Sequence, residues 1–152
     1  MSDAGKPSMS VDMTDESARI PAVPAPFRSL RCLLVDDDPF LRMLIGDILR
    51  DMGHEPVEAA EPDTALAMLH DDTFDVLLTD MRLPYMDGAE LAMRARQAYP
   101  SLRVIFATAY SESRLPDLAG DPIARYLRKP FGYRELDAAF RSLGYCSLPT
   151  KD

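Results

Sequence analysis

The sequence lacks the features by which several large classes of protein are recognised. It has no apolar run near the roughly 20 residues that a membrane-spanning helix needs. Its first residues carry neither the basic start nor the apolar stretch of a secretory signal peptide. With a formal net charge of −8, it also lacks the basic surface that binds nucleic acids. We therefore expect a cytoplasmic protein that binds neither membranes nor nucleic acid.

Motifs for structural zinc, redox chemistry and dinucleotide binding are missing as well. The two cysteines, Cys32 and Cys146, lie at opposite ends of the predicted domain, with no CxxC and no zinc spacing. His54 and His70 stand apart from any ligand pattern, so we expect structural or surface roles for them. No Gly-x-Gly-x-x-Gly follows a predicted strand, which disfavours a dinucleotide-binding domain.

The 152 residues are enough for one domain with a full core. Residues 1–29 are rich in proline, serine, alanine and charge, which predicts a disordered or extended tail. A short apolar run begins at Leu30, and we expect the folded domain to span residues 30–144. Residues 145–152 are expected to form a short C-terminal tail.

Within this domain, short apolar runs alternate with segments of helical periodicity. Helices are expected to begin at Pro39 and Pro62, to follow Gly88, and to end the domain before Gly144. This alternation predicts an α/β fold: a five-stranded, parallel, doubly wound sheet with helices on both faces. The predicted strands are residues 30–35, 55–59, 74–79, 102–107 and 123–128.

Polar residues follow the predicted strands at the points where the apolar runs stop. Asp36 and Asp37 follow the first strand, Asp80 the third, Thr108 the fourth and Lys129 the fifth. Ligands of doubly wound sheets bind outside the carboxyl ends of the strands, so we expect these side chains to share one pocket. Asp38, by contrast, is expected to act only as a helix cap.

Three carboxylates, a hydroxyl and an ammonium define a specific chemistry. Carboxylate oxygens are suited to a hard divalent cation, Mg²⁺ or in its place Mn²⁺. An aspartate can act as a nucleophile and form an acyl phosphate. The metal would stabilise the charge that spreads over the transferred group, with the lysine and threonine contacting its oxygens.

Four stretches of the sequence resemble the receiver domain of two-component response regulators. They are residues 33–39, 78–88, 107–109 and 128–131, and the resemblance extends over residues 30–143. It implies that Asp80 is the phosphoacceptor and that Asp36 and Asp37 are the acidic pair, with Asp37 the more direct metal ligand. The backbone carbonyl of Arg82 would supply a further ligand.

The same resemblance implies the residues that respond to the phosphoryl group. Thr108 would be the switch hydroxyl, and Lys129 the phosphate-binding lysine. Lys129 and Pro130 would be joined by a cis peptide bond. Tyr126, three residues before Lys129, falls at the aromatic switch position.

Residues 106–110 resemble the Phe-Ala-Thr-Gly-x-Tyr signature of certain single-domain receivers, whose kinases are commonly of the HWE or HisKA2 type. The match departs from the signature, since Ala109 replaces the glycine and Tyr110 comes one residue early. Arg82, Ala109 and Tyr110 would line the rim of the pocket. Residues 111–122 contain Pro116 and have poor apolar periodicity, which predicts an irregular or mobile fourth helix.

These observations predict a single-domain response regulator rather than an enzyme. Its phosphoryl donor would be a sensor histidine kinase or a histidine phosphotransfer protein. Its output would be protein contact, phosphate relay or competition for phosphoryl groups, since only residues 145–152 follow the last helix. The alternatives are a small phosphatase or phosphotransferase that forms an aspartyl phosphate, and a pseudo-receiver that binds partners without phosphorylation.

Overall fold

The computed structural model describes residues 28–109 and 121–145. Five parallel strands form one sheet in the order β2-β1-β3-β4-β5, which confirms the predicted doubly wound fold. The elements are β1 (Arg31–Val35), α1 (Pro39–Asp51), β2 (Glu55–Ala59), α2 (Pro62–Asp71), β3 (Val76–Asp80), α3 (Gly88–Ala98), β4 (Arg103–Thr108), β5 (Ala124–Arg128) and α4 (Tyr133–Ser142).

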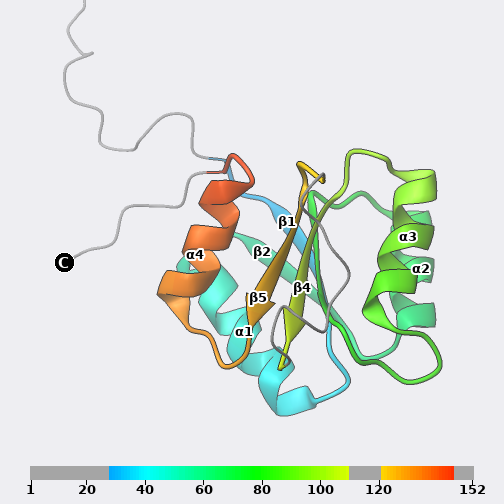
Figure 1. The fold of residues 1–152 in the computed structure, drawn as a ribbon, viewed down its shortest axis with the longest axis horizontal. Helices are drawn as coiled ribbons and strands as arrows, with labels where there is room; N and C mark the ends of the chain where they lie inside the picture. Colours follow the sequence, from blue (N-terminus) through cyan, green and yellow to red (C-terminus); the bar gives the residue numbers. More distant parts are fainter. Residues whose placement is uncertain (1–27, 110–120, 146–152) are drawn as a thin grey trace, which may run out of the picture.

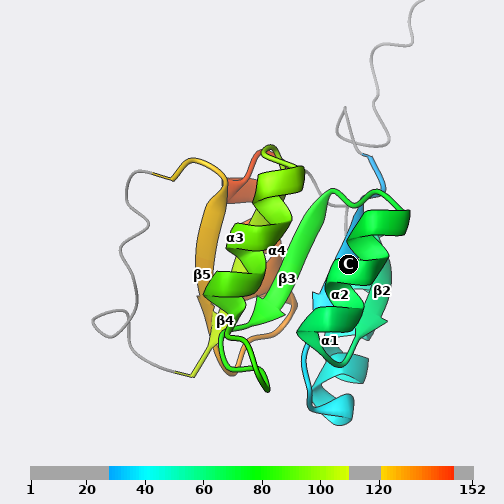
Figure 2. The same cartoon turned by 90° about the vertical axis from the view of Figure 1, so that its right-hand side faces the viewer.

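Helices cover both faces of the sheet, with α1 and α4 on one side and α2 and α3 on the other (Figure 1). Figure 2 views the sheet from the α2 and α3 side, with β5 at one edge and β2 at the other. Each face has its own apolar core, because alternate residues of a strand point to opposite sides. Leu34 and Leu78 pack toward α1 and α4, whereas Leu33 and Leu77 pack toward α2 and α3.

The sequence signals at the start of α1 act as predicted. The Asp38 carboxylate accepts hydrogen bonds from the amides of Phe40 and Leu41, and therefore caps α1. Pro39 occupies the first helical turn, where its missing N–H costs no hydrogen bond. After the helix, Gly53 adopts a positive φ of 92°, a conformation that glycine reaches without strain.

Several predicted boundaries are wrong by one or two residues. β3 begins at Val76 and β4 at Arg103, later than predicted, and both strands extend through the polar residue expected to follow them. The cause is strand pairing: Asp80 lies opposite Ala107, and Thr108 lies opposite Arg128, so the ladder continues past the apolar run. The last helix ends at Ser142, before Gly144 as predicted.

Two predictions fall outside the described residues. The irregular fourth helix was expected at 111–122, of which the structure describes only Asp121 and Pro122. The tails at 1–29 and 145–152 also stay predictions, although Arg28 pairs with Asp75 and Tyr145 packs against Phe140. In the part of the chain that is described, no helix is long and apolar enough to cross a membrane.

Candidate functional site

Three carboxylates meet at the carboxyl ends of β1 and β3. Oxygens of Asp36, Asp37 and Asp80 lie within 4.8 Å of one another. Strand pairing brings them together, because Val35 lies opposite Thr79 and the acidic residues follow directly. Asp36 is only 2% exposed and the Asp80 side chain 15%, whereas Asp37 is open to solvent. The predicted convergence of these residues is therefore present in the structure.

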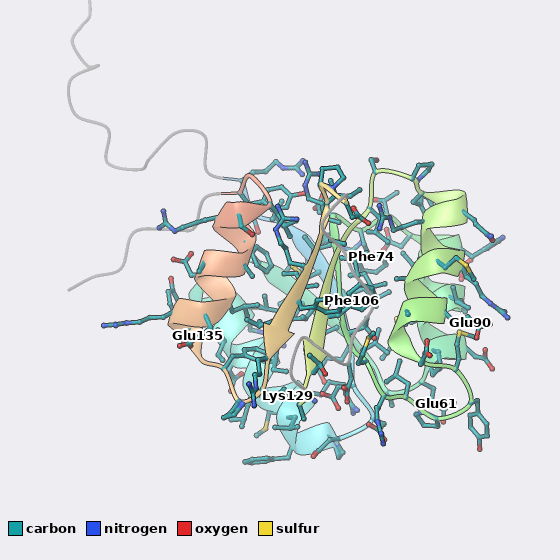
Figure 3. All side chains as sticks on the ribbon, viewed as in Figure 1. Glu61, Phe74, Glu90, Phe106, Lys129 and Glu135 are labelled. Atoms are coloured by element: carbon teal, nitrogen blue, oxygen red, sulfur yellow. The ribbon has the colours of Figure 1, made fainter. Side chains whose placement is uncertain are left out.

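The ammonium group of Lys129 reaches this acidic cluster from the end of β5. Its Nζ lies 3.2 Å from Asp80 Oδ2 and 3.5 Å from Asp36 Oδ2. Figure 3 shows Lys129 at the end of the sheet to which the β4 and β5 arrows point. The Lys129 backbone N–H donates to the Thr108 carbonyl at 2.7 Å, and its peptide bond to Pro130 is cis, as expected. Lys129 thus places a positive charge beside the proposed phosphoacceptor.

Asp36 is buried, and both its backbone amide and its carboxylate are hydrogen-bonded to the protein. Its amide donates to the Ala59 carbonyl, and its Oδ1 accepts a hydrogen bond from the Asp38 amide at 2.9 Å. Burial raises the pKa of Asp36, whereas the Asp38 amide and the Lys129 ammonium favour its charged form. Asp36 is thus enclosed while Asp37 is open to solvent, and the expectation that Asp37 contacts a metal more directly stays a prediction.

The structure places the predicted switch residues at or near the carboxyl ends of β4 and β5. Thr108 is the last residue of β4 and is buried, while Ala109 after it is exposed. Tyr126 is half-buried in β5, and its ring lies 5.6 Å from that of Phe106. Tyr110 lies outside the described residues. The aromatic pair therefore lies on β4, which ends at Thr108, and on β5, which Lys129 follows directly.

Arg82 belongs to the loop that leaves β3. Its backbone N–H donates to Asp80 Oδ1 at 3.3 Å, and the residue as a whole is exposed. This contact places Arg82 beside the carboxylate of Asp80, in agreement with a position at the rim. The roles of its carbonyl as a metal ligand and of its side chain as a cover stay predictions.

Two features of the site were not predicted from the sequence. Gly88, at the start of α3, packs so closely that a Cβ there would lie 2.3 Å from the Asp80 carbonyl oxygen. The sequence predicted a helix after Gly88 but not this close approach. The second feature is Arg42, which donates to the backbone carbonyl of Asp36 at 2.7 Å. Its position on α1 carried no signal that it would reach the acidic turn.

Comparison with known proteins identifies the family. The family model of the response regulator receiver domain matches residues 32–141. This chain belongs to the response regulator receiver family. Members of this family are signalling domains of two-component systems, and the sheet order and the acidic cluster described above agree with that membership.

Among curated receiver relatives, the chain is 36% identical over 107 residues to the response regulator receiver protein CpdR of Brucella abortus. That match covers 70% of this chain and 89% of CpdR. This chain is also 37% identical over 106 residues to the chemotaxis protein CheY of Pseudomonas aeruginosa. That match covers 67% of this chain and 86% of CheY. The match to FleR of Pseudomonas aeruginosa is also 37% identical, but covers only 23% of that protein.

A solved receiver structure with a bound metal also resembles this chain. The response regulator TrrA of Thermotoga maritima, in complex with Mg²⁺-BeF, has a TM-score of 0.66 and 31% identity. The match covers 74% of this chain and 97% of that one. A CheY-like receiver domain from Methanospirillum hungatei has a TM-score of 0.68 and 29% identity, covering 77% of this chain and 95% of its own.

The donor set of this receiver domain suits a hard divalent cation. Mg²⁺ takes oxygen ligands and is commonly held by one or two carboxylates together with water and phosphate oxygens. The cluster offers three carboxylates, of which the exposed Asp37 is reached from solvent without any movement of the chain. Asp36, Asp37 and Asp80 would hold such a cation, whose charge would stabilise a phosphoryl group at Asp80.

Proposed function

We propose that this chain is a response regulator receiver that is phosphorylated on Asp80 in a Mg²⁺-dependent reaction. The observation that carries the proposal is the meeting of three carboxylates within 4.8 Å, with the Lys129 ammonium 3.2 Å from Asp80. Like charges this close are unfavourable by themselves, so a cluster of this kind is expected to bind a cation. The lysine beside it suits an anionic group.

In the proposed reaction, a carboxylate oxygen of Asp80 attacks the phosphorus of a phosphohistidine on the donor protein. A P–O bond forms, the P–N bond breaks, and its electron pair returns to the imidazole nitrogen of the donor. Asp80 is suited to this role because its carboxylate, although mostly buried, is not fully enclosed: 15% of the side chain is exposed. Lys129 Nζ is near enough to contact the new phosphoryl oxygens.

The phosphorylated state is proposed to signal through Thr108 and Tyr126. Thr108 would move toward the phosphoryl oxygens, and Tyr126 would then turn inward along β5. Support comes from the pairing of β4 with β5, in which Phe106 lies opposite Tyr126 and Thr108 opposite Arg128. A movement of Thr108 is thus passed to the strand that carries Tyr126. Arg82, Ala109 and Tyr110 would cover the acyl phosphate.

The partners belong to the same proposal. Receiver domains act with histidine kinases or phosphotransfer proteins, and the solved structures similar to this chain include the receiver domain of the hybrid histidine kinase CckA, at 27% identity and a TM-score of 0.62. We propose a sensor kinase of the HWE or HisKA2 type, a cytoplasmic location, and output by protein contact. Residues 30–144 would form the receiver, and the segments 1–29 and 145–152 its tails.

Labelling by a small phosphodonor tests the phosphoacceptor. With radiolabelled acetyl phosphate and Mg²⁺, wild type should acquire a hydroxylamine-sensitive label, and Asp80→Asn should lose it because an amide is not a nucleophile. The matched control is Asp38→Asn, which removes a neighbouring carboxylate but keeps a good helix cap. It should still be labelled. Full labelling of Asp80→Asn would place the phosphoacceptor elsewhere and overturn the proposal.

A further inference from the structure

One arginine connects the turn of the acidic pair to the neighbouring strand. Arg42, in the first turn of α1, donates from Nη1 to the Asp36 carbonyl at 2.7 Å and from Nε to Glu58 Oε1 at 3.1 Å. Glu58 lies on β2, opposite Leu34 of β1. The Arg42 side chain is only 17% exposed, so both hydrogen bonds are largely shielded from water. The guanidinium therefore has a fixed position.

These contacts complete the support of the acidic turn. The Asp36 amide and the Asp36 carboxylate are already held by Ala59 and Asp38. Arg42 secures the remaining backbone group of Asp36, its carbonyl, and this carbonyl belongs to the peptide unit that leads into Asp37. Because Asp37 is itself exposed, its position depends on the backbone on either side of it.

We propose that Arg42, held in place by Glu58, is a positioning residue that fixes the turn carrying Asp36 and Asp37. In this way it sets the Mg²⁺ affinity of the acidic cluster. The inference rests on the proposed function, since it takes the cluster to be a Mg²⁺ site. Partners behind metal ligands orient those ligands, and their loss commonly weakens metal binding by about 10- to 100-fold.

The sign of the effect separates positioning from simple electrostatics. Arg42 carries a positive charge next to the turn of Asp36 and Asp37, so its removal makes the surroundings of the site more negative. If charge alone mattered, Arg42→Ala would bind Mg²⁺ more tightly than wild type. If Arg42 positions the turn, the same variant binds Mg²⁺ more weakly. The two explanations therefore predict opposite shifts.

Metal titration of the full 152-residue chain measures this shift. The chain has no tryptophan, so Mg²⁺ binding is followed by titration calorimetry and Mn²⁺ binding by electron paramagnetic resonance. We expect Arg42→Ala to bind about 10-fold more weakly. The matched control is Arg50→Ala, which removes the same charge from the same helix but only an exposed contact to Asp47. It should stay within about twofold of wild type.

Substitutions of Glu58 test whether it acts through Arg42. Glu58→Gln keeps an oxygen that accepts from Arg42 Nε, so its Mg²⁺ affinity should stay within about twofold of wild type, whereas Glu58→Ala should bind about threefold more weakly. In the Arg42→Ala background, Glu58→Ala should add nothing, because the residue through which it acts is gone. An additive loss in the double variant would show that Glu58 acts independently and would overturn that part of the inference.

The outcomes separate this inference from the proposed function. If wild type binds no Mg²⁺, the proposed metal site is wrong. If wild type binds Mg²⁺ and Arg42→Ala binds equally or more tightly, the metal site stands and the positioning role is wrong. Should Arg42→Ala prove unfolded by circular dichroism, Arg42→Lys decides: it keeps the charge but lacks the planar guanidinium whose Nε and Nη1 donate to the two acceptors from fixed positions. Weaker binding by Arg42→Lys supports positioning, and wild-type affinity overturns it.

Discussion

The two ends of the sheet carry their charges in opposite ways. Where the strands begin, carboxylates face guanidinium groups: Asp75 contacts Arg28 at 2.7 Å, and Arg31 pairs with Asp72 and Glu55. Where the strands end, three carboxylates lie within 4.8 Å of one another beside the ammonium of Lys129. The first arrangement pairs opposite charges, and the second gathers like charges.

This difference separates a structural network from a binding site. Pairs of opposite charge near the surface contribute modestly to stability, and at the beginning of the strands Arg31 also stacks on the Phe74 ring at 4.8 Å. A cluster of like charges lowers the stability of the fold unless a cation joins it. Folding alone gives no reason to gather Asp36, Asp37 and Asp80, so the cluster is better explained by a cation that would bind there.

The largest effect is expected from the backbone packing behind Asp80. Gly88→Ala would bring a Cβ to within 2.3 Å of the Asp80 carbonyl oxygen, so the chain must shift. We expect the free energy of unfolding to fall by about 2–3 kcal/mol in urea titrations. Gly132→Ala is the control, because its Cβ would meet only Glu135 Oε1, at 3.6 Å. Equal stability of the two variants would show that the approach to Asp80 is not tight.

Removal of an acid where the strands begin should destabilise the fold. Asp75 accepts from the Arg31 backbone N–H at 2.9 Å and pairs with Arg28. Asp75→Ala leaves that N–H without its acceptor, so we expect a loss of about 1–2 kcal/mol in the free energy of unfolding. Asp47→Ala, which removes only an exposed pair with Arg50, should change it by no more than about 0.5 kcal/mol.

The carboxyl ends of the strands were predictable because their sequence signal is local. β1, β3 and β4 are largely continuous apolar runs, and each is followed within two residues by a candidate site residue: Asp36, Asp80 and Thr108 respectively. In a parallel sheet those ends share one edge, so convergence followed from topology. The helix start at Asp38 and Pro39 was equally local.

Contacts between elements could not be predicted in the same way. Arg42 reaches Asp36 and Glu58 only because of the rotation of α1 and the register in which Glu58 lies opposite Leu34. The close approach of Gly88 to Asp80 depends on how the loop after β3 returns to the sheet. The strand starts were misplaced because pairing with neighbours, rather than hydrophobicity, decides where the ladder begins.

Removal of an acid where the strands end should raise the free energy of unfolding of the metal-free protein, whereas Asp75→Ala lowers it. In metal-free solution, Asp37→Asn relieves repulsion within the cluster, so we expect the free energy of unfolding to rise by about 1 kcal/mol. With excess Mg²⁺ wild type should become the more stable of the two proteins, because it gains stability from Mg²⁺ binding and the variant has lost a ligand. Thermal unfolding with and without Mg²⁺ measures both signs. A destabilised Asp37→Asn in metal-free buffer would contradict the comparison between the two ends.

The smallest effect concerns His54, a buried histidine next to the beginning of β2. Its Nδ1 accepts a hydrogen bond from the Leu30 amide at 3.1 Å, and its ring stacks on Phe140 with the centroids 5.0 Å apart. Burial lowers the pKa of His54, while the charges of Asp137 and Asp75 act in the opposite direction. The folded protein therefore binds this proton less readily than the unfolded chain does.

The sign of the pH dependence follows from that difference. The contribution of His54 to stability is fully present above the unfolded pKa of about 6.5 and is lost as the pH falls below it. Between about pH 7.5 and 6.0 the loss is at most about 0.8 kcal/mol.

His54→Asn keeps an acceptor near Nδ1 but cannot titrate, so its stability should fall less over this range. His70→Asn, at a side chain 87% exposed, is the control and should keep the wild-type pH dependence. If His54→Asn and wild type lose stability in parallel in urea titrations, protonation of His54 does not contribute to the pH dependence of the fold.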